Sequence, residues 1–265
     1  MLMPEYPPKP RPGDRVAVVS PASGSPEIFP LPFDLGLRRL REDFGLEPVE
    51  YPTTRKMGSS PAERAADLHA AFADESIKAV IASIGGDDQI TVLPYLDAEL
   101  IRANPKPYFG YSDNVNLLAY LSSLGIVGYH GGAVMTEFGR AGRLHPLTEA
   151  SLRAALFESG EFELRTAESY CDVETDWEDP AAFSVEPETV PAQGWIWRGR
   201  ETVVTGRSWG GCLEVVSWLL MADMAIPPPE YFDGAVLFIE TSEEMHPDIE
   251  VYRVLRCLGE RGVLD

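Results

Sequence analysis

Short apolar runs alternate with helix-periodic segments over the first 130 residues of this 265-residue chain. Four runs, each ending at a polar or glycine-containing turn, occupy residues 16–19, 79–84, 106–111 and 126–129. The segments between them carry apolar residues at helical spacing. Repeated strand–helix alternation predicts an α/β fold, in which helices pack on both faces of a parallel sheet.

Helix signals support this pattern. Ser60-Pro61-Ala62-Glu63 combines an N-cap serine, a proline at the first helical position and a glutamate three residues after the cap, which together form a capping box. Further helices are predicted over 91–103 and 114–124.

An acidic segment divides the chain. Residues 161–188 contain ten acidic side chains against the single Arg165, and they lack apolar periodicity. We therefore predict an N-terminal α/β domain over 1–160, an acidic linker over 161–192 and a C-terminal α/β domain over 193–265. In the last part, a helix over 213–220, a strand over 235–239 and a helix around 251–258 are expected to lead into another strand, so this domain is expected to be truncated.

Composition excludes several classes of partner. The chain has 22 Lys+Arg against 42 Asp+Glu, a formal charge of −20. This charge disfavours binding to nucleic acid or to an anionic membrane surface. Three scattered cysteines form no disulfide framework, and four histidines show no metal-ligand spacing. Since no signal peptide and no run of about 20 apolar residues is present, we predict a soluble, cytoplasmic protein without a metal site.

Ser112 follows the predicted strand over 106–111 and precedes a predicted helix. Free N–H groups at a helix N-terminus can stabilise an oxyanion, so Ser112 is a candidate nucleophile. The alternative is that Ser112 or Asp113 only caps the helix. Local pattern leaves both interpretations open.

Other residues fall at predicted strand ends or beyond. Gly85 and Gly86 could let a backbone N–H approach a substrate closely, or could form a plain tight turn. His130 is expected to support a neighbouring group by hydrogen bonding. Trp195 and Trp197 would share one side of a strand, where they would pack in a core or an inter-domain seam, or else stack on a planar ligand.

An ordered set of motifs resembles the LD-carboxypeptidase family of serine peptidases, and within it the branch of microcin immunity proteins. The motifs span residues 19–23, 83–88, 93–97, 109–113, 131–135, 210–213 and 237–244. One of them, Gly-Gly-Cys-Leu, has Cys212 where the family has asparagine, so hydrogen bonding there is expected to differ.

The resemblance implies a Ser-Glu-His triad assembled across two domains, with Ser112 as nucleophile and Glu240 as the carboxylate that orients the histidine. It also implies an oxyanion hole formed by the N–H groups of Gly86 and Asp113. Trp195 matches an aromatic residue that stacks on a nucleobase, and Gly85 and His130 are expected to contact substrate.

The family's catalytic histidine has no counterpart in this sequence, so the chain is expected to be inactive or nearly so. The implied parent is a cytoplasmic, homodimeric serine carboxypeptidase that cleaves a peptide or peptidyl-nucleotide and needs no cofactor. Two alternatives remain: a carboxypeptidase of cell-wall peptides, and a non-catalytic protein that binds a small ligand.

Overall fold

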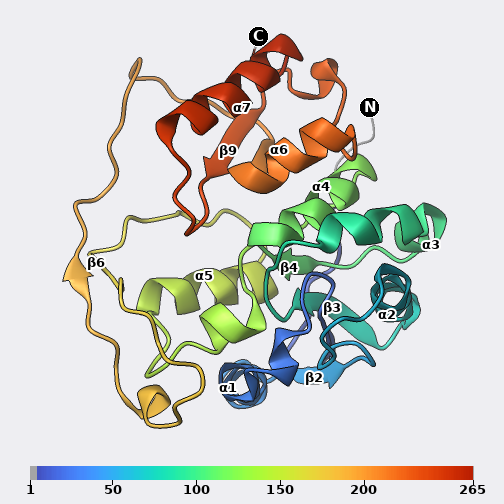
Figure 1. Cartoon of the computed structure of the whole chain (residues 1–265), viewed down its shortest axis with the longest axis vertical. Helices are drawn as coiled ribbons and strands as arrows, with labels where there is room; N and C mark the ends of the chain where they lie inside the picture. The colour runs from blue at the N-terminus through green and yellow to red at the C-terminus, as the bar shows by residue number, and fades with distance from the viewer. Residues whose placement is uncertain (1–4, 265) are drawn as a thin grey trace.

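The computed structural model describes residues 5–264 and contains a five-stranded parallel sheet (Figure 1). Its strands are β1 (Arg15–Val19), β2 (Glu47–Glu50), β3 (Ile77–Ala82), β4 (Tyr108–Gly110) and β5 (Tyr129–His130). Their order is β2-β1-β3-β4-β5, with every neighbouring pair parallel. The predicted α/β class is confirmed. The order reverses between β1 and β3, and ligands of such sheets bind beyond the strands' carboxyl ends at this point.

Helices cover both faces of the sheet. One face carries α2 (Pro61–Ala73), α3 (Ala98–Ala103) and α4 (Val115–Ser123); the other carries α1 (Pro30–Glu42), the π-helical turn η4 (Val134–Phe138) and α5 (Pro146–Phe157). Because side chains alternate along a strand, Ala17 and Val19 join the first core, whereas Val16 and Val18 join the second.

Several element boundaries differ from the sequence prediction. The capping box at Ser60 is present. The single helix predicted over 91–103 is wrong: a 3₁₀ helix, η2 (Gln89–Tyr95), precedes α3, since Pro94 lacks the N–H that a continuous α-helix needs. β2 and α5 were not predicted. Further 3₁₀ turns are η1 (Ser25–Glu27), η3 (Ser112–Asn114), η5 (Ala182–Ser184) and η6 (Pro229–Tyr231).

The C-terminal part forms a smaller α/β unit. It contains β8 (Ser208–Cys212), α6 (Leu213–Ala222), β9 (Val236–Glu240) and α7 (Asp248–Glu260). β8 pairs in parallel with β9, which places Cys212 opposite Glu240. The unit packs on α4 through a third core that includes Val115, Ala119, Trp209 and Val216. Figure 1 shows α6 beside α4.

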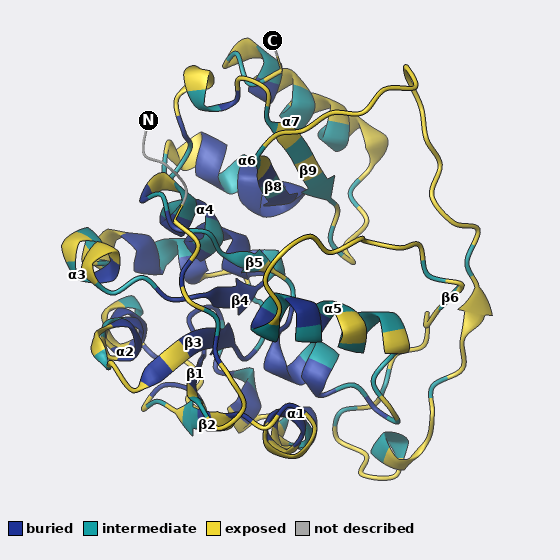
Figure 2. Cartoon of the chain, turned by 180° about the vertical axis from the view of Figure 1, so that it is seen from behind, coloured by how far each residue is buried: buried dark blue, intermediate teal, exposed yellow. Residues whose placement is uncertain are grey.

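A long exposed segment connects α5 to β8, and Figure 2 shows it wrapping around the outside of the molecule. Its regular structure is one short antiparallel pair, β6 (Ser169–Tyr170) with β7 (Val190–Pro191), and η5. Among residues 5–264, every helix is too short or too polar to span a lipid bilayer.

Candidate active site

Ser112 begins η3 and is separated by one residue from the end of β4 at Gly110, at the edge where the carboxyl ends of the strands meet. Its φ of 57° lies in the left-handed region, which non-glycine residues seldom adopt. Residues held in such conformations cluster at functional sites, because the surrounding structure has to compensate for the strain. Half-burial leaves the serine partly accessible.

Gly85 packs directly against Ser112. A Cβ placed on Gly85 would lie 2.9 Å from both Cβ and Oγ of Ser112, and 3.6 Å from the backbone nitrogen of Asp113. A side chain at Gly85 would therefore displace the serine. A Cβ on Gly86 would lie 3.3 Å from the carbonyl oxygen of Ala22 and 3.2 Å from Cβ of Ser23. The loops after β1, β3 and β4 thus meet at one place.

The side chain of Asp113 fixes the turn after β3. Its Oδ2 accepts hydrogen bonds from the backbone N–H groups of Asp88 (3.0 Å) and Gln89 (2.8 Å). Its Oδ1 accepts from Nδ2 of Asn116 at 2.7 Å. Burial raises the pKa of Asp113 to about 6, an effect that the two backbone hydrogen bonds oppose. The side chain therefore holds the glycine turn, while the backbone remains beside Ser112.

A buried polar network supports the same turn and was not predicted. Oδ1 of Asn114 accepts from the Tyr108 hydroxyl at 2.6 Å and from Nε2 of Gln89 at 2.9 Å. Nδ2 of Asn114 donates to the carbonyls of Ile84 and Tyr111, both at 3.0 Å. Buried polar groups of this kind need such partners. Amide side chains next to a strand end were the available signal.

Arg64, on α2, joins the loops after β1 and β3. Its guanidinium is buried, donates to the carbonyls of Pro21 (2.8 Å) and Ala22 (3.1 Å), and pairs with the carboxylate of Asp88. This contact was also missed, because nothing near Arg64 in the sequence indicates which loop it reaches.

Glu240 ends β9 and contacts His130, which ends β5. Oε1 of Glu240 lies 3.0 Å from Nε2 of His130, and both side chains are partly exposed. The Phe238 ring meets the edge of the imidazole, with ring centroids 5.6 Å apart. Two residues singled out in distant parts of the sequence are therefore brought together, across the two units of the chain.

Glu214, on α6, organises the loop after Glu240. It is buried, and its Oε1 accepts hydrogen bonds from the Ser242 hydroxyl (2.8 Å) and backbone N–H (3.1 Å). Oε2 accepts from Sγ of Cys212 at 3.0 Å. Burial and this contact raise the pKa of the Cys212 thiol to about 12. Cys212 thus stays a neutral thiol that donates a hydrogen bond to the carboxylate of Glu214.

Trp195 lies in the connecting segment, outside any strand. It is 53% exposed, and its ring meets the ring of Trp197 edge-on at 5.9 Å. The interpretation of this pair as core or seam packing is wrong, because both side chains are largely exposed, Trp197 to 80%. Its role in ligand stacking stays a prediction.

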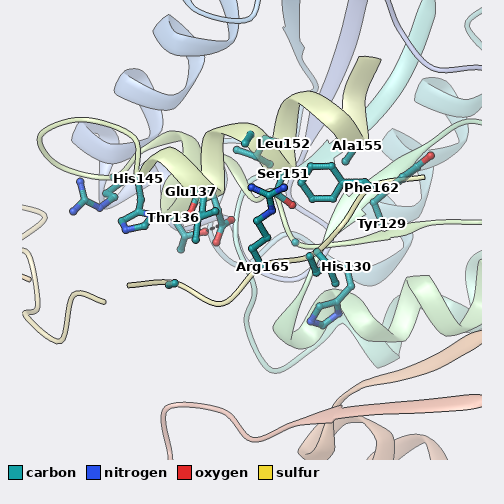
Figure 3. A pocket seen from close by; sticks show the side chains of 18 of the residues that line it. Tyr129, His130, Thr136, Glu137, His145, Ser151, Leu152, Ala155, Phe162 and Arg165 are labelled. Atoms are coloured by element: carbon teal, nitrogen blue, oxygen red, sulfur yellow. Dashed lines mark hydrogen bonds between the residues drawn. The ribbon is translucent and has the colours of Figure 1, made fainter. Parts of the chain in front are cut away.

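A cavity of about 950 Å³ lies beside the ends of β4 and β5 (Figure 3). Tyr129, His130 and Glu137 line it from the sheet side, Leu152 from α5, and Phe162 and Arg165 from the connecting segment. Its size lies within the range of small-molecule sites. Within residues 5–264, no group of three or more His, Cys, Asp or Glu side chains is arranged to hold a metal ion.

Comparison with known proteins gives the family. A family model described as the LD-carboxypeptidase N-terminal domain matches residues 16–131, and one described as the LD-carboxypeptidase C-terminal domain matches residues 205–265. A putative carboxypeptidase of Streptomyces coelicolor is 32% identical over 270 residues, an alignment that covers 96% of this chain and 72% of the relative. The chain belongs to the LD-carboxypeptidase family.

A second relative within this family is the microcin C7 self-immunity protein MccF of Escherichia coli. It is 29% identical over 191 residues, which cover 71% of this chain but only 54% of MccF. A solved structure of MccF in complex with aspartyl sulfamoyl adenosine has a TM-score of 0.85 and 24% identity, and covers 99% of this chain and 78% of that one. The predicted resemblance and fold are confirmed.

Proposed function

We propose that this chain carries the machinery of a serine carboxypeptidase, with Ser112 as the nucleophile. The observation that supports it best is the left-handed Ser112, held against a glycine that leaves room for its hydroxyl. The N–H groups of Gly86 and Asp113 would donate to the oxyanion, and Glu240 would orient a histidine. The family supplies the reaction class, which is hydrolysis of an amide bond near the end of a peptide.

In this reaction the Ser112 oxygen bonds to the carbonyl carbon, and the serine proton passes through a histidine to the leaving amine as the C–N bond breaks. Water then attacks the acyl-serine and releases the carboxylic acid. The electrophilic carbonyl needs donors aimed at its oxygen, which backbone N–H groups beside a strand-to-helix turn can supply.

His130 holds the carboxylate of Glu240 in this structure. Among residues 5–264, the hydroxyl of Ser112 makes no hydrogen bond to a histidine. We infer that proton transfer from Ser112 is inefficient in this chain. Substrate binding and oxyanion stabilisation then remain, and in serine proteases they accelerate the reaction about 10³–10⁴-fold over water.

The test is covalent labelling with an activated acyl ester, followed by mass spectrometry of the adduct. Because oxyanion stabilisation remains and the ester is activated, the chain should still acquire an adduct, slowly, on the peptide that contains Ser112, and S112A should not. S112T, which keeps a hydroxyl but adds a methyl group beside Gly85, should label more slowly. Equal labelling of the chain and S112A would contradict the proposal.

For the substrate we favour a peptidyl-nucleotide, because MccF is a relative and was solved with aspartyl sulfamoyl adenosine. Trp195 would stack on the base. Since stacking of a base on an aromatic side chain contributes about 1–3 kcal/mol, W195A should weaken binding of this compound at least fivefold. W197A is the matched control and should bind nearly as the parent chain does.

The same pair of variants tests the alternative, a carboxypeptidase of cell-wall peptides. If W195A weakens binding of a murein tetrapeptide and leaves the nucleotide compound unaffected, the preference is reversed. The homodimer that the resemblance implies stays a prediction, which sedimentation velocity would check.

A further inference from the structure

Glu137 is a carboxylate that the proposed reaction does not use. It lies on the π-helical turn η4 and lines the 950 Å³ cavity. Its Oε2 accepts hydrogen bonds from the backbone N–H of Ala133 at 2.8 Å and from the Thr136 hydroxyl at 2.9 Å. Both donors are neutral. Burial raises the pKa of Glu137 above its usual value, and these two hydrogen bonds oppose the shift.

The arginine side chains that line this cavity form ion pairs with carboxylates other than Glu137. Arg140 pairs with Glu186 at 2.9 Å, and Arg165 pairs with Glu163 at 3.1 Å. His145, a further titratable group in the wall, forms no ion pair with Glu137. Within residues 5–264, Glu137 therefore has no ion-pair partner. A partly desolvated carboxylate in this situation favours the approach of a cation.

The rest of the cavity is largely apolar. The ring of Tyr129 stacks on Phe109, with centroids 4.7 Å apart and planes within 10°, which makes one rigid wall. Leu152 adds an aliphatic surface from α5, and Phe162 adds an aromatic ring from the connecting segment (Figure 3). Phe162 is 46% exposed, so it has surface left to cover a ligand.

We propose that this cavity binds a part of the substrate that carries an ammonium group on an apolar or aromatic body, with Glu137 as the counter-ion. The assignment to substrate rests on the proposed function, because His130 lines the cavity and also contacts Glu240. The cavity thus adjoins the candidate reaction centre. An amino-terminal or side-chain amine of a peptide has this chemistry.

Binding of two small probes tests the proposal without any catalysis. Phenethylamine and N-acetylphenethylamine share a ring, but only the first is cationic at pH 7. In NMR titrations of the whole chain, phenethylamine should bind at least tenfold more tightly. E137Q, which still accepts the hydrogen bond from Ala133, should abolish this preference. E163Q removes an exposed carboxylate that the connecting segment contributes to the same cavity, and this variant should keep the preference.

F162A should weaken the binding of both probes and leave the ratio of their affinities unchanged. The proposal is overturned if neither probe binds saturably, if the neutral probe binds as tightly as the amine, or if E137Q keeps the preference. S112A should bind both probes as the parent does. Loss of acyl labelling and loss of amine preference are therefore separate results, and either proposal can fail alone.

Discussion

Ser112 can occupy its left-handed conformation because Gly85 leaves a space where another residue would place a side chain. In G85A, a Cβ would lie 2.9 Å from the Ser112 hydroxyl oxygen. Since overpacking costs roughly 1–3 kcal/mol, we expect a lower free energy of unfolding and at least a tenfold loss of acyl labelling. Denaturant unfolding and the labelling assay measure the two effects.

The control for this substitution is G259A in α7, where the added Cβ would have only an ordinary contact, 3.8 Å from Leu264. Alanine is the better helix former, so G259A should be as stable as the parent or more so. If G85A labels as fast as G259A, the close packing at Ser112 has no bearing on reactivity.

Burial of Asp113 is expected to make the stability of the fold depend on pH, with a sign that follows from the direction of its pKa shift. Burial raises its pKa from the ordinary value of 3.8 to about 6 in the folded chain. Between these values the folded state holds a proton that the unfolded state has released, so stability falls as pH rises through the window and is level above it. This difference of about two in pKa corresponds to a change of roughly 3 kcal/mol in the free energy of unfolding across this window.

Urea unfolding of the chain and of D113N from pH 4 to pH 7 checks this expectation. The free energy of unfolding of the parent should fall more steeply with pH than that of D113N, whose side chain does not titrate. Parallel curves would show that Asp113 titrates alike in both states.

The sequence drew attention to Ser112, Gly85 and Glu240 because strand ends are visible as patterns. The supports of these residues could not be found in that way. Asn114 depends on partners contributed by β4 and η2, and Arg64 on carbonyls beyond β1, so each contact exists only once the sheet has formed. The contact between Glu240 and His130 is likewise set by the docking of two units.

At the scale of single elements, the capping box of α2 is the clearest case of local coding. The backbone N–H of Glu63 donates to Oγ of Ser60, and the carboxylate of Glu63 accepts from the backbone of Ser60. S60A should reduce the free energy of unfolding by about 1 kcal/mol, because a helix N–H loses its acceptor. S60D restores an acceptor, so its free energy of unfolding should stay within a few tenths of a kcal/mol of the parent's. Equal losses in the two variants would argue against the cap.

β8, which was not predicted, lacks such a local signal. β8 contains Gly210 and Gly211, both with φ near 135°, and glycines are depleted in strands. It forms a strand because β9 pairs along its whole length. A Cβ on Gly210 would collide with the carbonyl of Phe238, so close approach of the two backbones requires glycine there.

At the scale of the whole molecule, the contact between β8 and α4 joins the two units. A Cβ on Gly211 would lie 2.5 Å from Cγ2 of Val115. G211A should therefore lower the free energy of unfolding by about 2 kcal/mol or more, through this collision and the positive φ. G160A has a φ of 112°, close to that of Gly211, with nothing within 4 Å, so it reports the conformational cost without a collision. A smaller loss in G211A than in G160A would contradict this account.

Strand–helix alternation was enough to predict a parallel sheet, because each helix between two strands serves as the crossover that parallel pairing requires. The third core was not predictable, because α4 looks like an ordinary sheet helix until its outer side, with Val115 and Ala119, is seen to face α6. Which helix of an α/β unit receives a second unit depends on shape, and periodicity carries no information about it.

The exposed connection between α5 and β8 has a mechanical consequence. A protease that cuts this connecting segment, whose acidic side chains are exposed to solvent, removes the covalent link between the two units. The apolar contacts among α4, α6 and β8 remain intact. The two fragments should then travel together as a nicked complex and separate only in denaturant.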